Sequence, residues 1–302
     1  MFLFIFSLFF SGCFERAEEK VMAIHPNGYK KTSFWTYPDG EILKRNEWYS
    51  NGIKELEIPY KRNEPHGKFK RWTAFGNVAG VGIYKKGKKE GKWETFFDND
   101  KIETRKYYKN DLKTGTWEAF HYNRNKAWVK YYKNDSAIGK WEKWYANGNL
   151  EEETSCHLGE PVGKKVRYYA DGKPQWLLTC RFGVKDGLGE QYYPSGLLQL
   201  KYYYKNGQLE GSLETYRANG KISKREFWKQ DVRDSLWSWF DSTGTEVLQS
   251  LFKKGTGTAY GLCPPGVKEL VCAESTFVNN KLDGALYYYK ENRQLRFEEV
   301  WR

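Results

Sequence analysis

The sequence has few of the features that define membrane, fibrous or disordered proteins. Among its 302 residues it has one long apolar run, at residues 1 to 10, and only nine prolines. No later segment approaches the roughly 18 to 20 apolar residues of a membrane-spanning helix. It has neither the glycine at every third position of collagen nor a sustained heptad. Aromatic residues make up 18% of the chain, too many for a disordered protein. A folded body without multiple membrane spans is expected.

Motifs for catalysis or metal binding are also missing. The four histidines, His25, His66, His121 and His157, are scattered, and none lies in a metal-binding spacing. No nucleophile elbow, phosphate loop or dinucleotide-binding glycine motif occurs in a strand-to-helix context. We therefore expect no enzymatic activity, no cofactor and no metal site.

The first residues have the pattern of an export signal. The apolar run at residues 1 to 10 leads into Ser11-Gly12-Cys13, which predicts a bacterial lipoprotein signal peptide over 1–12 and lipidation of Cys13. The alternatives are an ordinary cleaved signal peptide or a short buried segment. Residues 13–24 are expected to be a linker. The prediction places the protein in the bacterial cell envelope, anchored by lipid at the outer membrane or the periplasmic face.

The rest of the chain repeats with a period of 24 residues. Glycine recurs at 67, 91, 115, 139, 163, 187 and 211, and an aromatic residue follows each of these glycines after five positions. Two turn signals recur in each period, such as Asn147-Gly148 and Asn110-Asp111, and such pairs favour tight turns between antiparallel strands. Each period therefore predicts one β-hairpin, and the series of periods predicts a repeat protein.

These repeats resemble the MORN repeat, in particular its bacterial variant. The resemblance is carried by segments such as Lys86-Gly87-Lys88-Lys89-Glu90-Gly91-Lys92-Trp93 and covers residues 25–302. It implies an all-β fold: an elongated single-layer antiparallel sheet of about ten tandem 24-residue hairpins. The period slips around Gly257 to Gly266, which departs from the family pattern and predicts an irregular, cysteine-bearing repeat at 257–283. Members of the family typically act as scaffolds and partner-binding surfaces. Lipid binding has been proposed for some, and many bacterial members are labelled antitoxins.

The spacing of the cysteines distinguishes two pairs. Cys156 and Cys180 are one period apart, which in a hairpin array means two strand spacings, or about 10 Å. A disulfide needs Cα atoms within about 7 Å, so this pair is expected to stay unbridged. Cys263 and Cys272 flank Pro264-Pro265-Gly266 and form the candidate disulfide. Two free thiols are the alternative, and zinc binding is not expected.

Aromatic and basic residues are the candidate binding groups. Six aromatic residues recur in register and are expected along one face, as a binding groove or as the ladder that holds the hairpins together: Trp93, Phe96, Trp117, Phe120, Trp141 and Trp144. Residues 43 to 138 hold 22 lysines and arginines against 12 acidic residues. Five lysines there are candidate contacts to an anionic surface, lipid or glycan: Lys85, Lys86, Lys88, Lys89 and Lys92. The alternative is that these charges only keep the sheet soluble.

The expected function is therefore a non-catalytic envelope lipoprotein that serves as a protein-binding or scaffolding platform. An unidentified protein partner is expected, and the membrane is contacted through Cys13. Nucleic acid is not expected, because the protein is predicted to be exported. Two alternatives remain: an antitoxin-like protein that neutralises a toxin, and a hairpin solenoid that binds the cell wall or a glycan.

Overall fold

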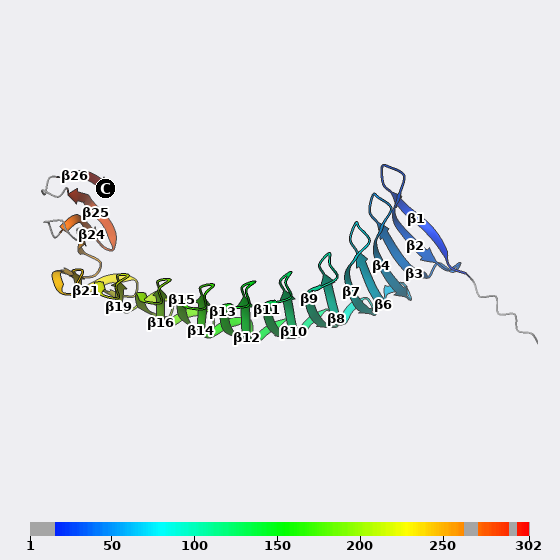
Figure 1. Ribbon diagram of the computed structural model, residues 1–302, viewed down its shortest axis with the longest axis horizontal. Coiled ribbons are helices and arrows are strands. Elements are labelled where there is room, and N and C mark those ends of the chain that lie inside the picture. Colours follow the sequence, from blue (N-terminus) through cyan, green and yellow to red (C-terminus); the bar gives the residue numbers. More distant parts are fainter. Residues whose placement is uncertain (1–15, 263–270, 290–294, 302) are drawn as a thin grey trace, which may run out of the picture. The chain divides into compact units, whose positions relative to one another are not determined.

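The computed structural model describes residues 16–262, 271–289 and 295–301, and all regular elements in these ranges are β-strands. The strands follow one another as a row of antiparallel hairpins (Figure 1). The all-β, single-layer fold predicted from the repeats is confirmed. No helix that would be long and apolar enough to cross a membrane occurs in these ranges.

The chain divides into two compact units, residues 1–125 with 132–135 and residues 126–131 with 136–302. The strands of the first unit are β1 (Glu18–Ile24), β2 (Lys30–Thr36), β3 (Ile42–Trp48), β4 (Lys54–Lys61), β5 (Glu64–Pro65), β6 (Gly67–Trp72), β7 (Val78–Lys85), β8 (Lys88–Phe96), β9 (Ile102–Lys109) and β10 (Leu112–Phe120). Strand β11 (Lys126–Lys133) contributes residues to both units.

The strands of the second unit are β12 (Ser136–Trp144), β13 (Leu150–His157), β14 (Glu160–Tyr168), β15 (Pro174–Arg181), β16 (Val184–Tyr192), β17 (Leu198–Lys205), β18 (Gln208–Leu209), β19 (Gly211–Tyr216), β20 (Ile222–Lys229), β21 (Val232–Phe240), β22 (Glu246–Phe252), β23 (Gly257–Leu262), β24 (Val271–Val278), β25 (Lys281–Tyr289) and β26 (Leu295–Trp301). Strands β1 to β22 belong to one sheet and β23 to β26 to a second sheet.

The pairing register repeats every two strands, as a 24-residue period requires. The leading glycine of a repeat lies opposite the same column of the next strand, as in Gly91 opposite Tyr108 and Gly187 opposite Tyr204, and in two repeats this column holds Cys156 and Cys180. Because equivalent residues recur two strands apart, each kind of side chain forms a row across the sheet.

The leading glycine of each repeat lies in a β-bulge. The pairing of β10 with β9 shifts between Thr114 and Glu118, and Gly115 there has a φ of 62°. A left-handed φ is the conformation that glycine adopts without steric penalty. Ser235 stands at this position in its repeat and takes the same conformation, with a φ of 60°.

The tight turns predicted late in each repeat are present. Asn110 and Asp111 connect β9 and β10 with φ values of 52° and 70°, the backbone of a two-residue hairpin turn. Backbone hydrogen bonds join each of these turns to the preceding hairpin, as from Asp111 N to the carbonyl of Lys89 at the start of β8, at 3.0 Å.

The hairpin array begins earlier than predicted. Residues 18–24, which the sequence assigned to a linker, form β1 and pair with β2. The carboxylate of Glu19 pairs with Lys30 and accepts a hydrogen bond from the Ser33 hydroxyl at 2.7 Å. The strand begins with three consecutive charged residues, a pattern that does not predict a strand from sequence. An edge strand can carry them because a sheet edge tolerates charge better than a sheet centre.

Three predictions fall outside the described residues. The signal peptide at 1–12 and the lipidated Cys13 lie before the described part of the chain, and Cys263 lies in the gap after Leu262. The side chain of Cys272 is not described either. Lipidation and the Cys263–Cys272 disulfide therefore stay predictions.

The main apolar cluster lies where the two sheets meet within the second unit. Trp237, Trp239 and Phe252 of the first sheet are buried, and Tyr260 and Phe277 of the second sheet pack against them. Phe252 is only 1% exposed. At this place, the single-layer sheet gains a second layer.

Candidate functional site: the ladder face

One face of the first sheet carries an aromatic ladder, which we call the ladder face. In the first unit, Trp93 stacks on Phe69 with ring centroids 4.9 Å apart and meets the edge of Tyr84 at 5.0 Å. Trp117 lies 5.1 Å from Tyr108 and 5.0 Å from Tyr132. The equivalent positions in the second unit are Trp141, Cys156, Lys165, Cys180, Gly189, Tyr204, Leu213, Trp228, Trp237 and Phe252. Cross-strand aromatic pairs of this kind stabilise adjacent strands.

The six aromatic residues predicted to share one face lie on both faces. Phe96, Phe120 and Trp144 each follow a ladder tryptophan by three residues, and side chains three apart in a strand point to opposite faces. Phe120 lines a hollow with Arg105, whereas Lys106, the next residue of β9, lies over the ring of Trp117. Of the six predicted residues, Trp93, Trp117 and Trp141 therefore belong to the ladder, and Phe96, Phe120 and Trp144 do not.

Lysines cover the ladder rings. The Nζ of Lys89 lies 4.8 Å from the ring centre of Trp93 and 5.0 Å from that of Tyr108. Lys113 and Lys106 lie 5.3 and 5.4 Å from Trp117. None of the ion pairs between described residues includes these three lysines. The ladder face of the first unit is thus aromatic and cationic.

The five lysines predicted to contact an anionic surface do not form one patch. Lys85 and Lys88 lie opposite each other in the register, beside Lys86 in the turn, and all three are exposed. Lys89 lies on the ladder rings, and Lys92 pairs with Glu94 at 3.1 Å. Contact to an anionic lipid or glycan stays a prediction, which only the three turn lysines can share.

The opposite face carries paired charges. In the second unit, Lys140 lies 2.9 Å from Glu142 and 2.7 Å from Glu153, and the Tyr168 hydroxyl donates to Glu153 at 2.7 Å. Burial alone would raise the pKa of Glu153, but the hydrogen bonds from Lys140 and Tyr168 outweigh it and lower this pKa. Hydrogen bonds to Glu153 and Glu142 raise the pKa of Lys140. The acidic residues here are neutralised within the chain.

The ladder is interrupted in the second unit. Cys156 and Cys180 occupy places where the other repeats have tyrosine, tryptophan or phenylalanine. Both are buried free thiols, as predicted for this pair, and burial raises the pKa of each thiol. A thiol is much smaller than a phenol ring, so the substitution removes a ring from the row.

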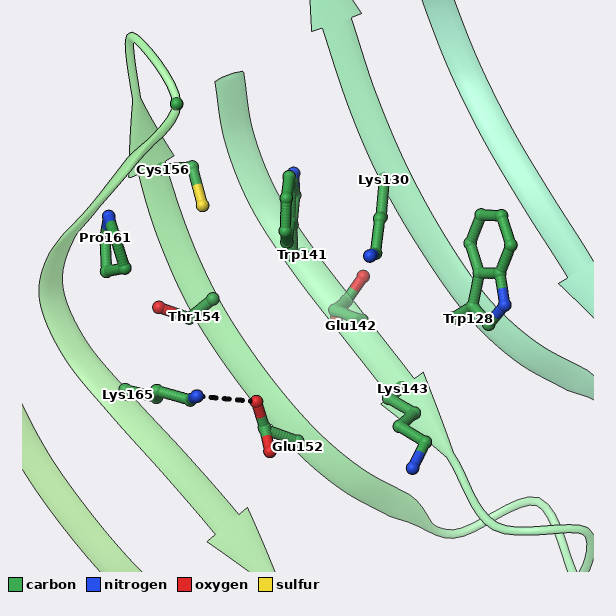
Figure 2. Close-up of a pocket in the computed structure, with 11 residues that line it drawn as sticks. Trp128, Lys130, Trp141, Glu142, Lys143, Glu152, Thr154, Cys156, Pro161 and Lys165 are labelled. Atoms are coloured by element: carbon green, nitrogen blue, oxygen red, sulfur yellow. Dashed lines mark ion pairs between the residues drawn. The ribbon is translucent and has the colours of Figure 1, made fainter. Parts of the chain in front are cut away.

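A groove of about 370 Å³ lies beside Cys156. Figure 2 shows Trp128 and Trp141 on one side, with Lys130 between them, and Pro161 on the other side. The Nζ of Lys130 lies 4.4 Å from the ring centre of Trp141 and 5.6 Å from that of Trp128. At the far end, Lys165 pairs with Glu152 at 3.0 Å.

A further interruption, at Gly189, is filled by the chain itself. A Cβ at Gly189 would lie 2.1 Å from the ring of Tyr202, which is directly opposite in β17. The ring therefore occupies the space above the glycine. Tyr202 also meets Tyr204 edge-on at 5.5 Å, so an aromatic contact is restored at this point of the row.

Sequence reasoning missed the groove, although its signal was visible. Placing the sequence in its 24-residue frame puts Cys156 in the column of Tyr108 and Tyr132. The spacing of Cys156 and Cys180 bears on disulfide geometry, whereas the groove follows from the ring that Cys156 replaces. Within the described part of the chain, no group of three histidine, cysteine or acidic residues is arranged to hold a metal ion.

Comparison with known proteins supports the repeat type. Residues 89–110 and 138–155 match the family model of the MORN repeat variant. No curated protein matches the chain.

Three solved structures that align with it are much larger than this chain. A complex of TcdB2, TccC3 and Cdc42 has 8% identity and a TM-score of 0.17, covering 91% of this chain and 18% of that chain. A Tc holotoxin pore of Photorhabdus luminescens has 10% identity and a TM-score of 0.18, covering 93% and 17%. Alternansucrase in complex with isomaltononaose has 12% identity and a TM-score of 0.15, covering 75% and 20%. The chain spans about a fifth of their length or less, and TM-scores this low do not indicate a shared fold.

Proposed function

We propose that this chain, which carries repeats of the MORN variant, is a non-catalytic platform that binds a protein partner on its ladder face. We further propose that it works in the bacterial cell envelope, held there by a lipid on Cys13. The first proposal concerns the face of the sheet that binds the partner, and the second concerns the cellular location of the protein. They are tested separately.

The observation that carries the first proposal is that the ladder face is already used once as a docking surface. At its C-terminal end the second sheet packs on Trp237, Trp239 and Phe252. Trp237 is 1% exposed there. The chain's own second layer therefore gives an example of how a protein surface covers this face.

The charge distribution also favours the ladder face. In the first unit, Lys89, Lys106 and Lys113 lie over ladder rings and make no ion pair with described residues. On the opposite face, glutamates such as Glu142 and Glu153 are neutralised by Lys140. Unpaired surface cations attract an acidic partner and raise its rate of association. The complementary partner is a protein with an acidic patch.

Charge reversal on one face tests the platform. Lys106→Glu with Lys113→Glu reverses two cations of the ladder face, and Lys164→Glu, an exposed lysine on the opposite face, is the matched control. Immobilised wild type and Lys164→Glu are expected to capture the same protein from an envelope extract, and the double variant at least tenfold less. Equal capture by all three would sink the ladder-face proposal.

The proposed location in the cell envelope is tested on the protein expressed with residues 1–12 in place. The intact mass and membrane fractionation of the wild type are compared with those of Cys13→Ala. We expect an acylated wild type in the membrane fraction and an unlipidated variant outside it. A cytosolic wild type that retains residues 1–12 would contradict the lipoprotein proposal and leave the ladder-face proposal to its own test.

A further inference from the structure

We propose that the groove beside Cys156 binds an aromatic side chain of the partner that has a carboxylate next to it in the partner's sequence. The inference rests on the proposed function because the ring comes from a protein partner. It names the chemistry that this partner inserts and the place where it inserts it. Four observations lead to it.

The first observation is the missing ring. Along the ladder, the column that holds Cys156 has Tyr84, Tyr108 and Tyr132 in the preceding repeats. The rings of these tyrosines contact the rings of the ladder tryptophans. The ring centroids of Tyr132 and Trp117, for example, are 5.0 Å apart. At Cys156 the row has a thiol instead, and a groove is found at that place.

The second observation is how the chain fills the gap at Gly189, in the neighbouring column of the ladder. Above Gly189, the ring of Tyr202 occupies the open place so closely that even a Cβ would collide with it. An aromatic ring is thus the occupant that this sheet itself uses. Beside Cys156 no ring of the described residues takes that place, because the groove remains there.

The third observation is the size and lining of the groove. Its volume of about 370 Å³ lies at the small end of ligand sites, which suits a single side chain better than an extended chain. Two indole rings and Pro161 line it together with charged residues such as Lys130, Lys143 and Lys165. Aromatic side chains are the commonest anchors of protein interfaces, and they bind in such hollows.

The fourth observation is the charge of the groove. Lys143 pairs with Glu151 and Lys165 pairs with Glu152, at 2.8 and 3.0 Å. Lys130 lies over the tryptophan rings and takes part in none of the ion pairs between described residues. Lys130 can therefore pair with a carboxylate of the partner that enters the groove beside the partner's aromatic ring.

The test uses p-hydroxyphenylacetate as the probe, with p-cresol as the same ring without the carboxylate. Binding to the full chain is followed by ligand-detected saturation-transfer NMR titration. Cys156→Tyr returns the ladder ring to the groove. Ser155→Tyr, its exposed neighbour on the opposite face of the strand, is the matched control. We expect saturable binding to wild type and Ser155→Tyr, and at least tenfold weaker binding to Cys156→Tyr.

Lys130→Met tests the carboxylate, because methionine keeps an apolar stem over the indoles. It is expected to weaken p-hydroxyphenylacetate binding about tenfold and to leave p-cresol binding unchanged. Equal loss for both probes, or no loss for either, would contradict the role of Lys130. Circular dichroism and thermal melting check that each variant is folded.

The groove assignment is overturned if p-hydroxyphenylacetate does not saturate the wild type, or binds Cys156→Tyr as well as the wild type. Should Cys156→Tyr fail to fold, Trp128→Ala removes one wall of the groove and must itself weaken binding about tenfold. Failure of the probe to bind leaves capture of a protein by the ladder face unaffected. The two proposals can therefore fail independently.

Discussion

Ser235 holds a backbone conformation that its side chain disfavours. Its φ of 60° costs a non-glycine residue roughly 1–2 kcal/mol, whereas glycine has a larger entropy loss on folding, of about 0.5–1 kcal/mol. Ser235→Gly is therefore expected to raise the free energy of unfolding by about 0.5–1 kcal/mol. The hydrogen bond from Ser235 N to the Asp234 carboxylate remains. Urea denaturation measures the change.

The reverse change is expected to be unfavourable at Gly91. Its φ is 65°, and a Cβ there would meet no atom within 4 Å, so Gly91→Ala isolates the cost of the backbone conformation. We expect a loss of about 1 kcal/mol. Gly82→Ala is the steric comparison, because its Cβ would lie 2.2 Å from Trp93, and it should cost more. An unchanged stability of Gly91→Ala would show that the bulge does not require glycine.

Three tyrosines on the opposite face couple stability to alkaline pH. Burial, followed by hydrogen bonds to glutamates, raises the pKa of Tyr168, Tyr192 and Tyr216 to about 12, from a usual value of 10. Because the folded pKa is raised, the stabilisation is complete below pH 10 and is lost as the pH rises through 12. The free energy of unfolding should therefore fall steeply between pH 10 and 12.

Denaturation at several pH values, with tyrosinate absorbance read in parallel, checks this prediction. The triple variant Tyr168→Phe, Tyr192→Phe, Tyr216→Phe should have a shallower pH dependence over the same range. A triple variant with the slope of the wild type would assign the alkaline transition to other groups.

At the scale of the hairpin, tyrosine hydroxyls link several repeats to the next one. The hydroxyl of Tyr145 donates to the Tyr168 carbonyl, and that of Tyr169 donates to the Tyr192 carbonyl, both at 2.8 Å. Tyr193 makes the same bond to Tyr216. The residue that donates and the carbonyl that accepts are 23 positions apart, so each bond joins two neighbouring hairpins.

Removing one such hydroxyl is expected to weaken the array. Tyr169→Phe leaves a carbonyl without its hydrogen bond and should lower the free energy of unfolding by about 1 kcal/mol. Tyr203→Phe is the matched control, because Tyr203 is 39% exposed and should change stability by less than about 0.5 kcal/mol. Equal effects of the two variants, measured by urea denaturation, would refute the role of the inter-repeat bond.

The strands and turns can be predicted from the sequence, but which side chains meet on each face of the sheet cannot. The period, the turns and the strand character were predicted from Gly115, Asn110-Asp111 and their equivalents, because each turn and strand is encoded locally. That Trp117 and Phe120 lie on opposite faces follows from the alternation of side chains along a strand, so it could have been predicted. The hydrogen bond from Tyr169 to the next repeat and the groove at Cys156 could not be predicted, because both depend on which residues of separate strands meet. Strand β1 was missed because its edge position permits a charged sequence.

At the scale of the whole chain, the joint between the two sheets holds the largest buried side chains. Phe252 lies 4.2 Å from the ring of Trp237 and 6.4 Å from that of Phe277. Phe252→Ala is expected to lower the free energy of unfolding of the second unit by about 3–5 kcal/mol, as truncation of a buried aromatic residue does.

Leu251→Ala provides the matched control for the joint. Leu251 is the adjacent residue and is 67% exposed, so its truncation should cost less than about 0.5 kcal/mol. Denaturation and limited proteolysis between β22 and β23 distinguish the variants: rapid cleavage is expected only for Phe252→Ala. Equal protection of both variants would mean that Phe252 does not hold the second sheet in place.

The ties between hairpins determine how the array responds to mechanical force. Tyrosine bonds of this kind join Tyr49, Tyr145, Tyr169 and Tyr193 to the repeats that follow them, whereas Thr73 and Phe97 stand at the same position between Tyr49 and Tyr145. Neither of those side chains has a phenolic hydroxyl. When a chain of nearest-neighbour joints is pulled from its ends, all joints bear the same load. The strands that follow Thr73 and Phe97 should therefore peel apart at a lower force than those joined by tyrosine.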